Sequence, residues 1–178
     1  MIPQSHTDDA WILQGWRKPE LSRDETLVDM FASTVARSPR APAIGALGEN
    51  DTLSYAELDA RSDRIAASLV QRGVGRGDIV GLWFRRSVDL HIAILGILKA
   101  GAAYLPFDAD APIERVERCL ADCGARLVVT HTALALPRRL GVETIDLASA
   151  LEGAATPVRS TARPDDPEWR RQPLRARG

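Results

Sequence analysis

The stretch that decides the fold runs from Ile79 to Asp108 and reads IVGLWFRRSVDLHIAILGILKAGAAYLPFD. Its first part, Ile79–Trp83, is a continuous apolar run of strand length, which is typical of a strand covered on both faces. Val88–Ala100 is apolar nearly all round and predicts a buried helix. Gly101 ends that helix, and Ala102–Leu105 supplies another short strand. The stretch therefore predicts a strand, a helix and a second strand in succession.

The residues before this stretch continue the alternation. Asp24–Arg37 carries apolar residues at four-residue spacing, which predicts an amphipathic helix that Pro39 ends. Residues 43–47 form a short apolar run, and residues 48–51 are typical of a turn, so a strand and a turn are expected here.

A second helix is predicted to follow that turn. Ser54 and Glu57 have the spacing of a capping box, in which Ser54 is the N-cap and Glu57 reaches back to it. Gly73 ends the helix. The apolar residues that it is expected to bury are Leu58, Ile65, Ala66 and Leu69.

The residues after Asp108 repeat the same pattern. Pro112 suits the first turn of a helix whose apolar residues share one face. Residues 126–130 form a β-rich run, and residues 142–147 indicate a further strand. Alternating helices and strands of this kind predict an α/β fold with a mostly parallel sheet.

Composition and charge exclude several classes of protein. The chain has 178 residues, of which 45% are hydrophobic and 26% charged, as expected for a soluble globular domain. A formal net charge of −1 gives no basic field for nucleic acid or an anionic membrane. The longest apolar stretch, Leu90–Leu98, is too short to span a bilayer, and residues 1–6 do not resemble a secretory signal. We therefore expect a cytoplasmic protein that binds neither nucleic acid nor membrane.

The two ends differ in composition from the middle. Residues 1–23 are mostly polar, contain Trp11 and Trp16 but show no clear period, and predict a poorly structured leader. Residues 24–155 form the folded part. Residues 156–178 are rich in arginine and proline with little apolar surface to bury, which predicts a disordered tail.

The glycine cluster Gly73–Gly77 is the first candidate for chemistry. A phosphate-binding glycine loop leaves a strand and enters a helix, whereas these glycines leave a helix and enter a strand. They predict a helix cap and a tight turn. Cys119 and Cys123 lack two further ligands at metal-binding spacing, because the histidines are scattered, and they predict helix packing.

Two further features leave alternatives open. Arg85 and Arg86 precede the buried helix and would suit either an anion at its N-terminus or, as the favoured interpretation, a solvated turn. His91 lies on a mostly apolar helix and is expected to be a hydrogen-bonded core or interface residue. No Ser/His/Asp or paired-carboxylate arrangement is present, so no catalytic, cofactor-binding or metal-binding residue is assigned.

Two strings carry a family resemblance. Leu53–Leu58 (LSYAEL) and Leu98–Asp108 (LKAGAAYLPFD) resemble the first two core motifs of nonribosomal peptide synthetase adenylation domains, which are members of the adenylate-forming ligase superfamily. When the sequence between and around these strings is included, the resemblance covers about residues 24–147. The sequence Gly81–Trp83, together with Leu105–Pro112, is most similar to the subgroup of polylysine-type (Pls/PosA-like) synthetases. Ala109 and Ala111 depart from the commoner family form, which affects the subgroup and not the fold.

The resemblance implies a fold and a reaction. It identifies residues 24–155 as a partial AMP-binding (adenylation) domain, namely the first subdomain of the ligase's N-terminal domain. Members use ATP and magnesium to convert an amino acid's carboxylate into an acyl-adenylate, and then pass the acyl group to a carrier domain. The phosphate loop, amino-acid pocket, ribose aspartate and catalytic lysine lie beyond the motifs found here. The resemblance therefore implies a fragment that binds no cofactor itself and is inactive alone, with the remainder of a synthetase or a carrier domain as partner.

The tail and the leader add two expectations. Residues 164–167 resemble the lead-in to the phosphate loop, but the text after Pro167 departs from the family, which favours a truncated or frameshifted gene. An alternative function is a stand-alone interaction or regulatory module that docks on a synthetase through Trp11 and Trp16. A third, a small nucleotide or redox domain, lacks the glycine loop that it needs.

Overall fold

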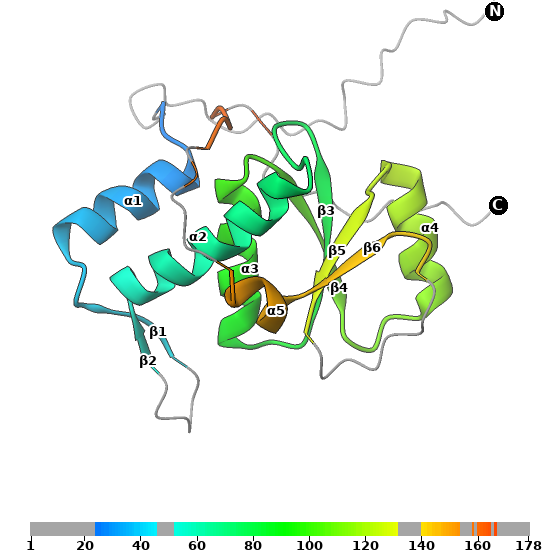
Figure 1. The fold of residues 1–178 in the computed structure, drawn as a ribbon, viewed down its shortest axis with the longest axis horizontal. Coiled ribbons are helices and arrows are strands. Elements are labelled where there is room, and N and C mark those ends of the chain that lie inside the picture. The colour runs from blue at the N-terminus through cyan, green and yellow to red at the C-terminus, as the bar shows by residue number, and fades with distance from the viewer. Residues whose placement is uncertain are drawn as a thin grey trace, which may run out of the picture.

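The computed structural model describes residues 24–45, 52–131, 140–153, 158, 160–164 and 166. Among these residues, the chain forms a parallel sheet with helices on both faces, and a small hairpin beside it (Figure 1). The predicted leader, residues 1–23, lies outside the described part. Within that part, every helix falls short of the length and apolar character that a membrane crossing requires.

The sheet is built from the strands β3 (Ile79–Phe84), β4 (Ala103–Asp108), β5 (Leu127–Thr130) and β6 (Glu143–Asp146). Their order is β4-β3-β5-β6, and each neighbouring pair is parallel. The predicted parallel sheet is therefore confirmed, and the stretch quoted at the outset supplies its central strand β3.

Helices cover both faces of this sheet. On one face lie α2 (Tyr55–Gln71), α3 (Val88–Lys99) and the short α5 (Leu147–Leu151), and on the other lies α4 (Ile113–Cys123) (Figure 1). The side chains of β3 alternate between the two cores that result. Leu82 packs with α2 and α3, whereas Trp83 packs with α4. Because both faces of β3 are buried, its side chains must be apolar at successive positions, which explains the uninterrupted apolar run Ile79–Trp83.

Two elements were not predicted. The strand β2 (Thr52–Ser54) pairs antiparallel with β1 (Pro42–Gly45), so the expected strand has a partner, whereas the expected turn at residues 48–51 lies outside the described residues. A three-residue strand is too short for a pattern of alternating residues to reveal it. The same holds for α5, whose five residues cover little more than one helical turn.

The ends of α2 follow the predicted signals. The Ser54 hydroxyl accepts a hydrogen bond from the Glu57 amide at 3.3 Å, and the Glu57 carboxylate accepts one from the Ser54 amide at 2.8 Å. The Ser54 hydroxyl also donates to the Glu57 carboxylate at 2.7 Å, and this bond, together with that of the Ser54 amide, lowers the pKa of the Glu57 carboxyl. At the other end, Gly73 has a φ of 77°, a conformation that L side chains rarely adopt.

Lys99 makes a contact that the sequence did not predict. It is the last residue of α3, and its side chain is 5% exposed. The Lys99 ammonium donates to the carboxylates of Asp59 and Asp63, each at 2.6 Å, and to the Asp59 carbonyl at 3.0 Å. The ring of Phe31, on the outer helix α1 (Leu27–Arg37), lies 5.5 Å from the same nitrogen. Lys99 thereby contacts α1 and α2 in addition to ending α3.

Gly96 allows α3 to approach α2 closely. A methyl group at this position would lie 2.5 Å from Cβ of Ile65 and 3.2 Å from the carbonyl oxygen of Ser62. No real Cβ packs at the first of these distances, so only glycine permits this approach. The close packing brings the end of α3 within reach of the two aspartates on α2.

Several residues of the segment beyond residue 155 make contacts with the sheet domain. Val158 packs against the first core, and the side chains of Ser160 and Asp166 bond to Leu98 and Arg76 respectively. Val158, residues 160–164 and Asp166 therefore have described contacts, and the start of the predicted disordered tail at residue 156 stays a prediction. The composition suggested disorder because little is apolar, but these contacts are mainly polar. Residues 167–178 lie outside the described part.

We expect Lys99→Met to lower the free energy of unfolding by about 3 kcal/mol, because two partly buried carboxylates would lose their cation. This is the lower end of the range for buried pairs, since the Asp59 side chain is 33% exposed. Urea denaturation at neutral pH measures the change. The control is Arg126→Gln, which removes an exposed 3.8 Å pair with Asp78 and should change stability by less than about 0.5 kcal/mol. Equal effects of the two substitutions would contradict a structural role for Lys99.

We expect Gly96→Ala to destabilise the protein by about 1–2 kcal/mol, because the clash with Ile65 outweighs the higher helix propensity of alanine. Its matched control is Gly75→Ala, where a methyl group would meet nothing within 4 Å. That control should stay within about 0.5 kcal/mol of the parent. The urea midpoints of the two variants compare them directly, and a Gly96→Ala variant as stable as its control would refute the close helix contact.

Candidate functional site: the carboxyl edge of the sheet

The carboxyl edge of the parallel sheet is the first place to look for a ligand, because open α/β sheets bind ligands beyond the carboxyl ends of their strands. Here β3 ends at Phe84 beside Asp108 of β4, with which it is in register. A cavity of about 530 Å³ lies at this edge. Its lining residues are Phe84, Arg85, Arg86, Asp108, Ala109, Asp110, Ala111, Pro112 and Arg115.

The charged side chains of this cavity are exposed. Arg85 pairs with Asp110 at 3.1 Å, but the two side chains are 70% and 84% exposed. A pair in such contact with water contributes little to stability or to holding a ligand. Arg86 is exposed as well. The hydroxyl of Ser87, rather than a bound anion, accepts the Leu90 amide at the start of α3. The structure therefore favours the solvated turn over the anion site.

Buried hydrogen bonds behind the cavity hold this edge in place. The Thr130 hydroxyl donates to the Trp83 carbonyl at 2.9 Å, and the Trp83 indole donates to the Asp108 carbonyl at 2.8 Å. Phe107 packs edge-on against Trp83, with ring centroids 6.5 Å apart. These contacts link the ends of β3, β4 and β5, and they make the edge a rigid support.

The glycine cluster forms the cap and turn that the sequence predicts. Gly73 and Gly77 have φ values of 77° and 90°, as a cap and a tight turn require. The Gly75 amide donates to the carboxylate of Asp78 at 2.9 Å. That amide is therefore engaged by a carboxylate of this chain, and the cluster does not fit a phosphate group.

The cysteines and His91 have structural surroundings. Cys119 is buried in the second core, and Cys123 is a partly buried free thiol on the same helix. His91 is exposed, and its ring nitrogen Nδ1 lies 3.0 Å from the Ser87 carbonyl. The expectation of a core or interface histidine is therefore wrong with respect to the core, because α3 turns this position away from the sheet.

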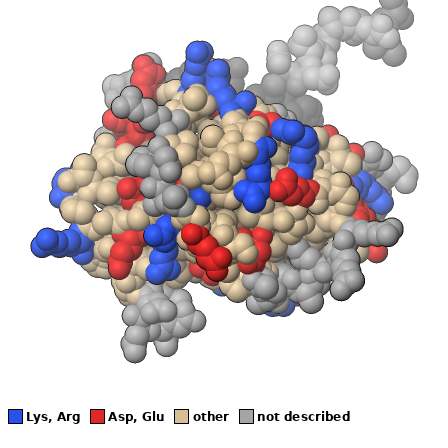
Figure 2. All heavy atoms as spheres, viewed as in Figure 1, with Lys and Arg blue, Asp and Glu red and all other residues tan. Residues whose placement is uncertain are grey.

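The described residues do not provide a set of ligands for the ATP and magnesium that the family resemblance implies. No group of three or more His, Cys, Asp or Glu residues in this part of the chain is arranged to hold a metal ion. The carboxylates of Asp59 and Asp63, which stand one helical turn apart, both accept from Lys99. Across the face in Figure 2, acidic and basic side chains are intermixed rather than gathered in a patch of one sign.

Comparisons with known proteins agree with this fold. Residues 31–176 match the family described as AMP-binding enzyme, so the change of pattern after Pro167 lies inside the matched region. Surfactin synthase subunit 3 of Bacillus subtilis (strain 168) is 38% identical over 89% of this chain and 13% of its own length. Gramicidin S synthase 1 of Brevibacillus brevis is 38% identical over 66% of this chain and 10% of its own length. The chain thus spans about an eighth or less of these relatives.

Solved structures show the same likeness. The crystal structure of the nonribosomal peptide synthetase FmoA3 superposes with a TM-score of 0.77 and 35% identity, covering 83% of this chain and 16% of that one. The form of FmoA3 with AMPPNP bound gives a TM-score of 0.74 and 36% identity, over 80% of this chain and 16% of the other. The predicted α/β fold is therefore that of adenylation domains.

Proposed function

The chain belongs to the AMP-binding enzyme family, and on that premise we propose that it forms the first α/β subdomain of an amino-acid-adenylating domain in a nonribosomal peptide synthetase. Its part there is to support the reaction rather than to perform it. The complete domain would use ATP and magnesium to join an amino acid's carboxylate to AMP, which turns a poor electrophile into an activated one. Membership of the polylysine-type subgroup, which the sequence around Trp83 indicates, stays a prediction.

One observation carries this proposal. The polar side chains of the two motif strings that could take part in a reaction instead make structural hydrogen bonds and ion pairs. Ser54 and Glu57 of the first string cap α2. Lys99 of the second string is buried against Asp59 and Asp63, which follow the first string on α2. A cation that two carboxylates already neutralise is not available to a phosphate group. Lys99 of the second string is thus bound to the helix that the first string begins.

The relatives support a proposal for the partners and the setting of this chain. Those relatives are synthetases much longer than this chain, and one solved neighbour is NpsA-ThdA of Klebsiella oxytoca, an artificial fusion of an adenylation domain and a carrier protein. We therefore propose the remainder of the adenylation domain as the direct partner, a carrier domain as the acceptor of the acyl group, and the cytoplasm as the compartment. The alternative of a docking module depends on Trp11 and Trp16, which lie outside the described residues.

We expect the 178-residue chain alone to show no amino-acid-dependent exchange of pyrophosphate into ATP, because its described residues offer no site for ATP phosphates. Exchange is measured with radiolabelled pyrophosphate and each proteinogenic amino acid in turn, with an intact adenylation domain as the positive control. Exchange clearly above the blank with any amino acid would refute a purely supporting role.

A graft tests the supporting role directly. Residues 24–166 replace the matching segment of the adenylation domain of gramicidin S synthase 1. We expect the chimera to exchange pyrophosphate with the same preferred amino acid as its recipient, because this segment contributes support and not selectivity. The same chimera with Lys99→Met should lose exchange together with folded protein. A chimera that prefers a different amino acid would contradict the proposal.

A further inference from the structure

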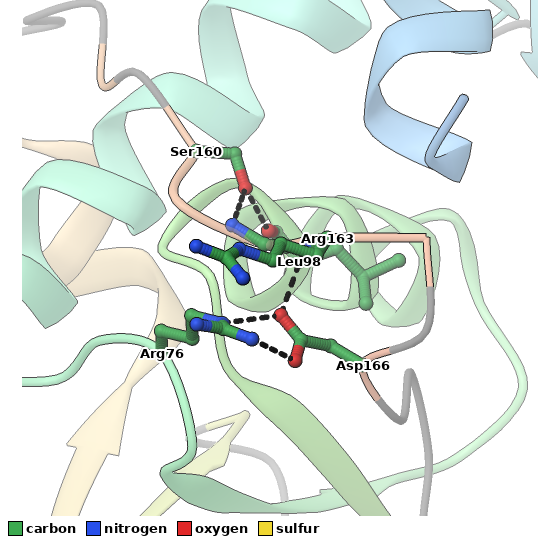
Figure 3. A network of polar contacts seen from close by, with 6 residues as sticks. Arg76, Leu98, Ser160, Arg163 and Asp166 are labelled. Atoms are coloured by element: carbon green, nitrogen blue, oxygen red, sulfur yellow. Dashed lines mark hydrogen bonds and ion pairs between the residues drawn. The ribbon is translucent and has the colours of Figure 1, made fainter. Parts of the chain in front are cut away.

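The chain returns to the subdomain after α5 and is held there by polar contacts (Figure 3). The Ser160 hydroxyl donates to the carbonyl of Leu98, near the end of α3, at 3.2 Å. The same oxygen accepts the Ala162 amide at 3.2 Å. Val158 packs against the first core. The first part of the returning segment is therefore attached to α3 and to the first core.

Asp166 provides the strongest of these contacts. Its two carboxylate oxygens accept from Nε and Nη2 of Arg76 at 2.7 and 2.8 Å, the two-pronged geometry that arginine makes with carboxylates. One of these oxygens also accepts the Arg163 amide at 2.7 Å. Figure 3 shows Arg76 and Asp166 pointing at each other from distant parts of the chain. The bonds lower the pKa of Asp166 to about 2.

The surroundings of these contacts place them at the amino edge of the sheet. Arg76 stands shortly before β3, and Gly101 stands shortly before β4. Gly101 has a φ of 85°, and a side chain there would approach the Thr161 hydroxyl within 3.0 Å. The returning segment thus lies close against the loops that lead into the two neighbouring strands.

The start of α1 lies at the same corner. A small cavity is lined both by the residues that begin α1 and by the returning segment. The members from the start are Glu25, Thr26, Leu27 and Val28, and those from the returning segment are Ala162, Arg163, Pro164 and Asp166. Both ends of the described chain therefore leave the subdomain side by side.

We propose that Arg76 and Asp166 form a latch that fixes the exit of the chain at the amino edge of the sheet, beside the start of α1. A single exposed ion pair would be too weak for this. The latch combines a two-pronged pair with the Arg163 amide, the Ser160 bond and the packing of Val158. A chain that leaves from the amino edge can run parallel to the existing strands and end at the carboxyl edge, where α/β sheets bind ligands.

This inference deepens the proposed function, because the remainder of the adenylation domain would be joined to the subdomain at the latch. Arg76 and Asp166 are then positioning residues, since neither would touch a substrate. Their test needs no enzymatic activity, so the latch and the adenylation role can fail independently.

Hydrogen exchange of the full 178-residue chain tests the latch. The amides of Ala162, Arg163 and Asp166 are all hydrogen-bonded within the segment and should exchange more slowly than in an unstructured peptide. We expect Arg76→Gln to speed their exchange about tenfold, since charge-assisted bonds are lost at a partly exposed site. The amides of β3 should keep their rates. The double variant Arg76→Asp with Asp166→Arg should recover part of the protection.

The matched control is Arg85→Gln, which removes an ion pair at the opposite edge of the sheet and should leave exchange at residues 160–166 unchanged. Wild-type amides that exchange as fast as an unstructured peptide would overturn the latch. So would an Arg76→Gln variant with unchanged rates, or an equal effect of Arg85→Gln.

The carboxyl titration of Asp166 gives a second readout. Its pKa in the folded chain is lowered from an ordinary 3.8 to about 2, so the latch should be fully formed above pH 4 and be lost as the pH falls through about 2. NMR of the Asp166 carboxyl carbon measures the midpoint. In Arg76→Gln the midpoint should rise toward the ordinary value, and a midpoint that does not move would overturn the pairing.

Discussion

The packing of this subdomain depends on one buried cation. Lys99 ends the largely apolar helix α3 and is neutralised by two aspartates of α2, one helical turn apart. Removing a charge from water is costly unless its partners are well placed, so the arrangement is stable only when α2 and α3 lie in one register. Gly96 makes that register attainable by removing the side chain that would separate the helices. The helix layer that covers one face of the sheet follows from these two residues.

This constraint explains why the two motif strings identify the family although their own side chains take no part in a reaction. The two motif strings are far apart in sequence but meet where Lys99 reaches the turns that follow the Ser54 cap. Ser54 and Glu57 of the first string form a cap, and Lys99 of the second belongs to a buried ion cluster. A motif can therefore be diagnostic of a family of enzymes while its own side chains stay remote from the reaction.

The sequence predicted those elements whose signals are local and long. The apolar runs of β3 and α3 and the capping box of α2 depend on neighbouring residues, and all were found where expected. Partnerships over long distances were not predicted: nothing near Lys99 indicates Asp63, and nothing near Arg76 indicates Asp166. The carboxyl-edge cavity was missed for the same reason, because its walls come from separate strands. Composition alone suggested disorder where polar bonds hold the chain.

The strand order has a consequence for how the sheet can grow. In the described part of the chain, β4 and β6 lie at the two margins, where a sheet can recruit a foreign strand and aggregate. Proline is tolerated in strands mainly at such margins, because it has no amide hydrogen to donate. Pro106 lies in the middle of β4 and has no amide hydrogen. Any strand that lies beside β4 therefore receives no hydrogen bond from that residue, which limits how regular the ladder can be there.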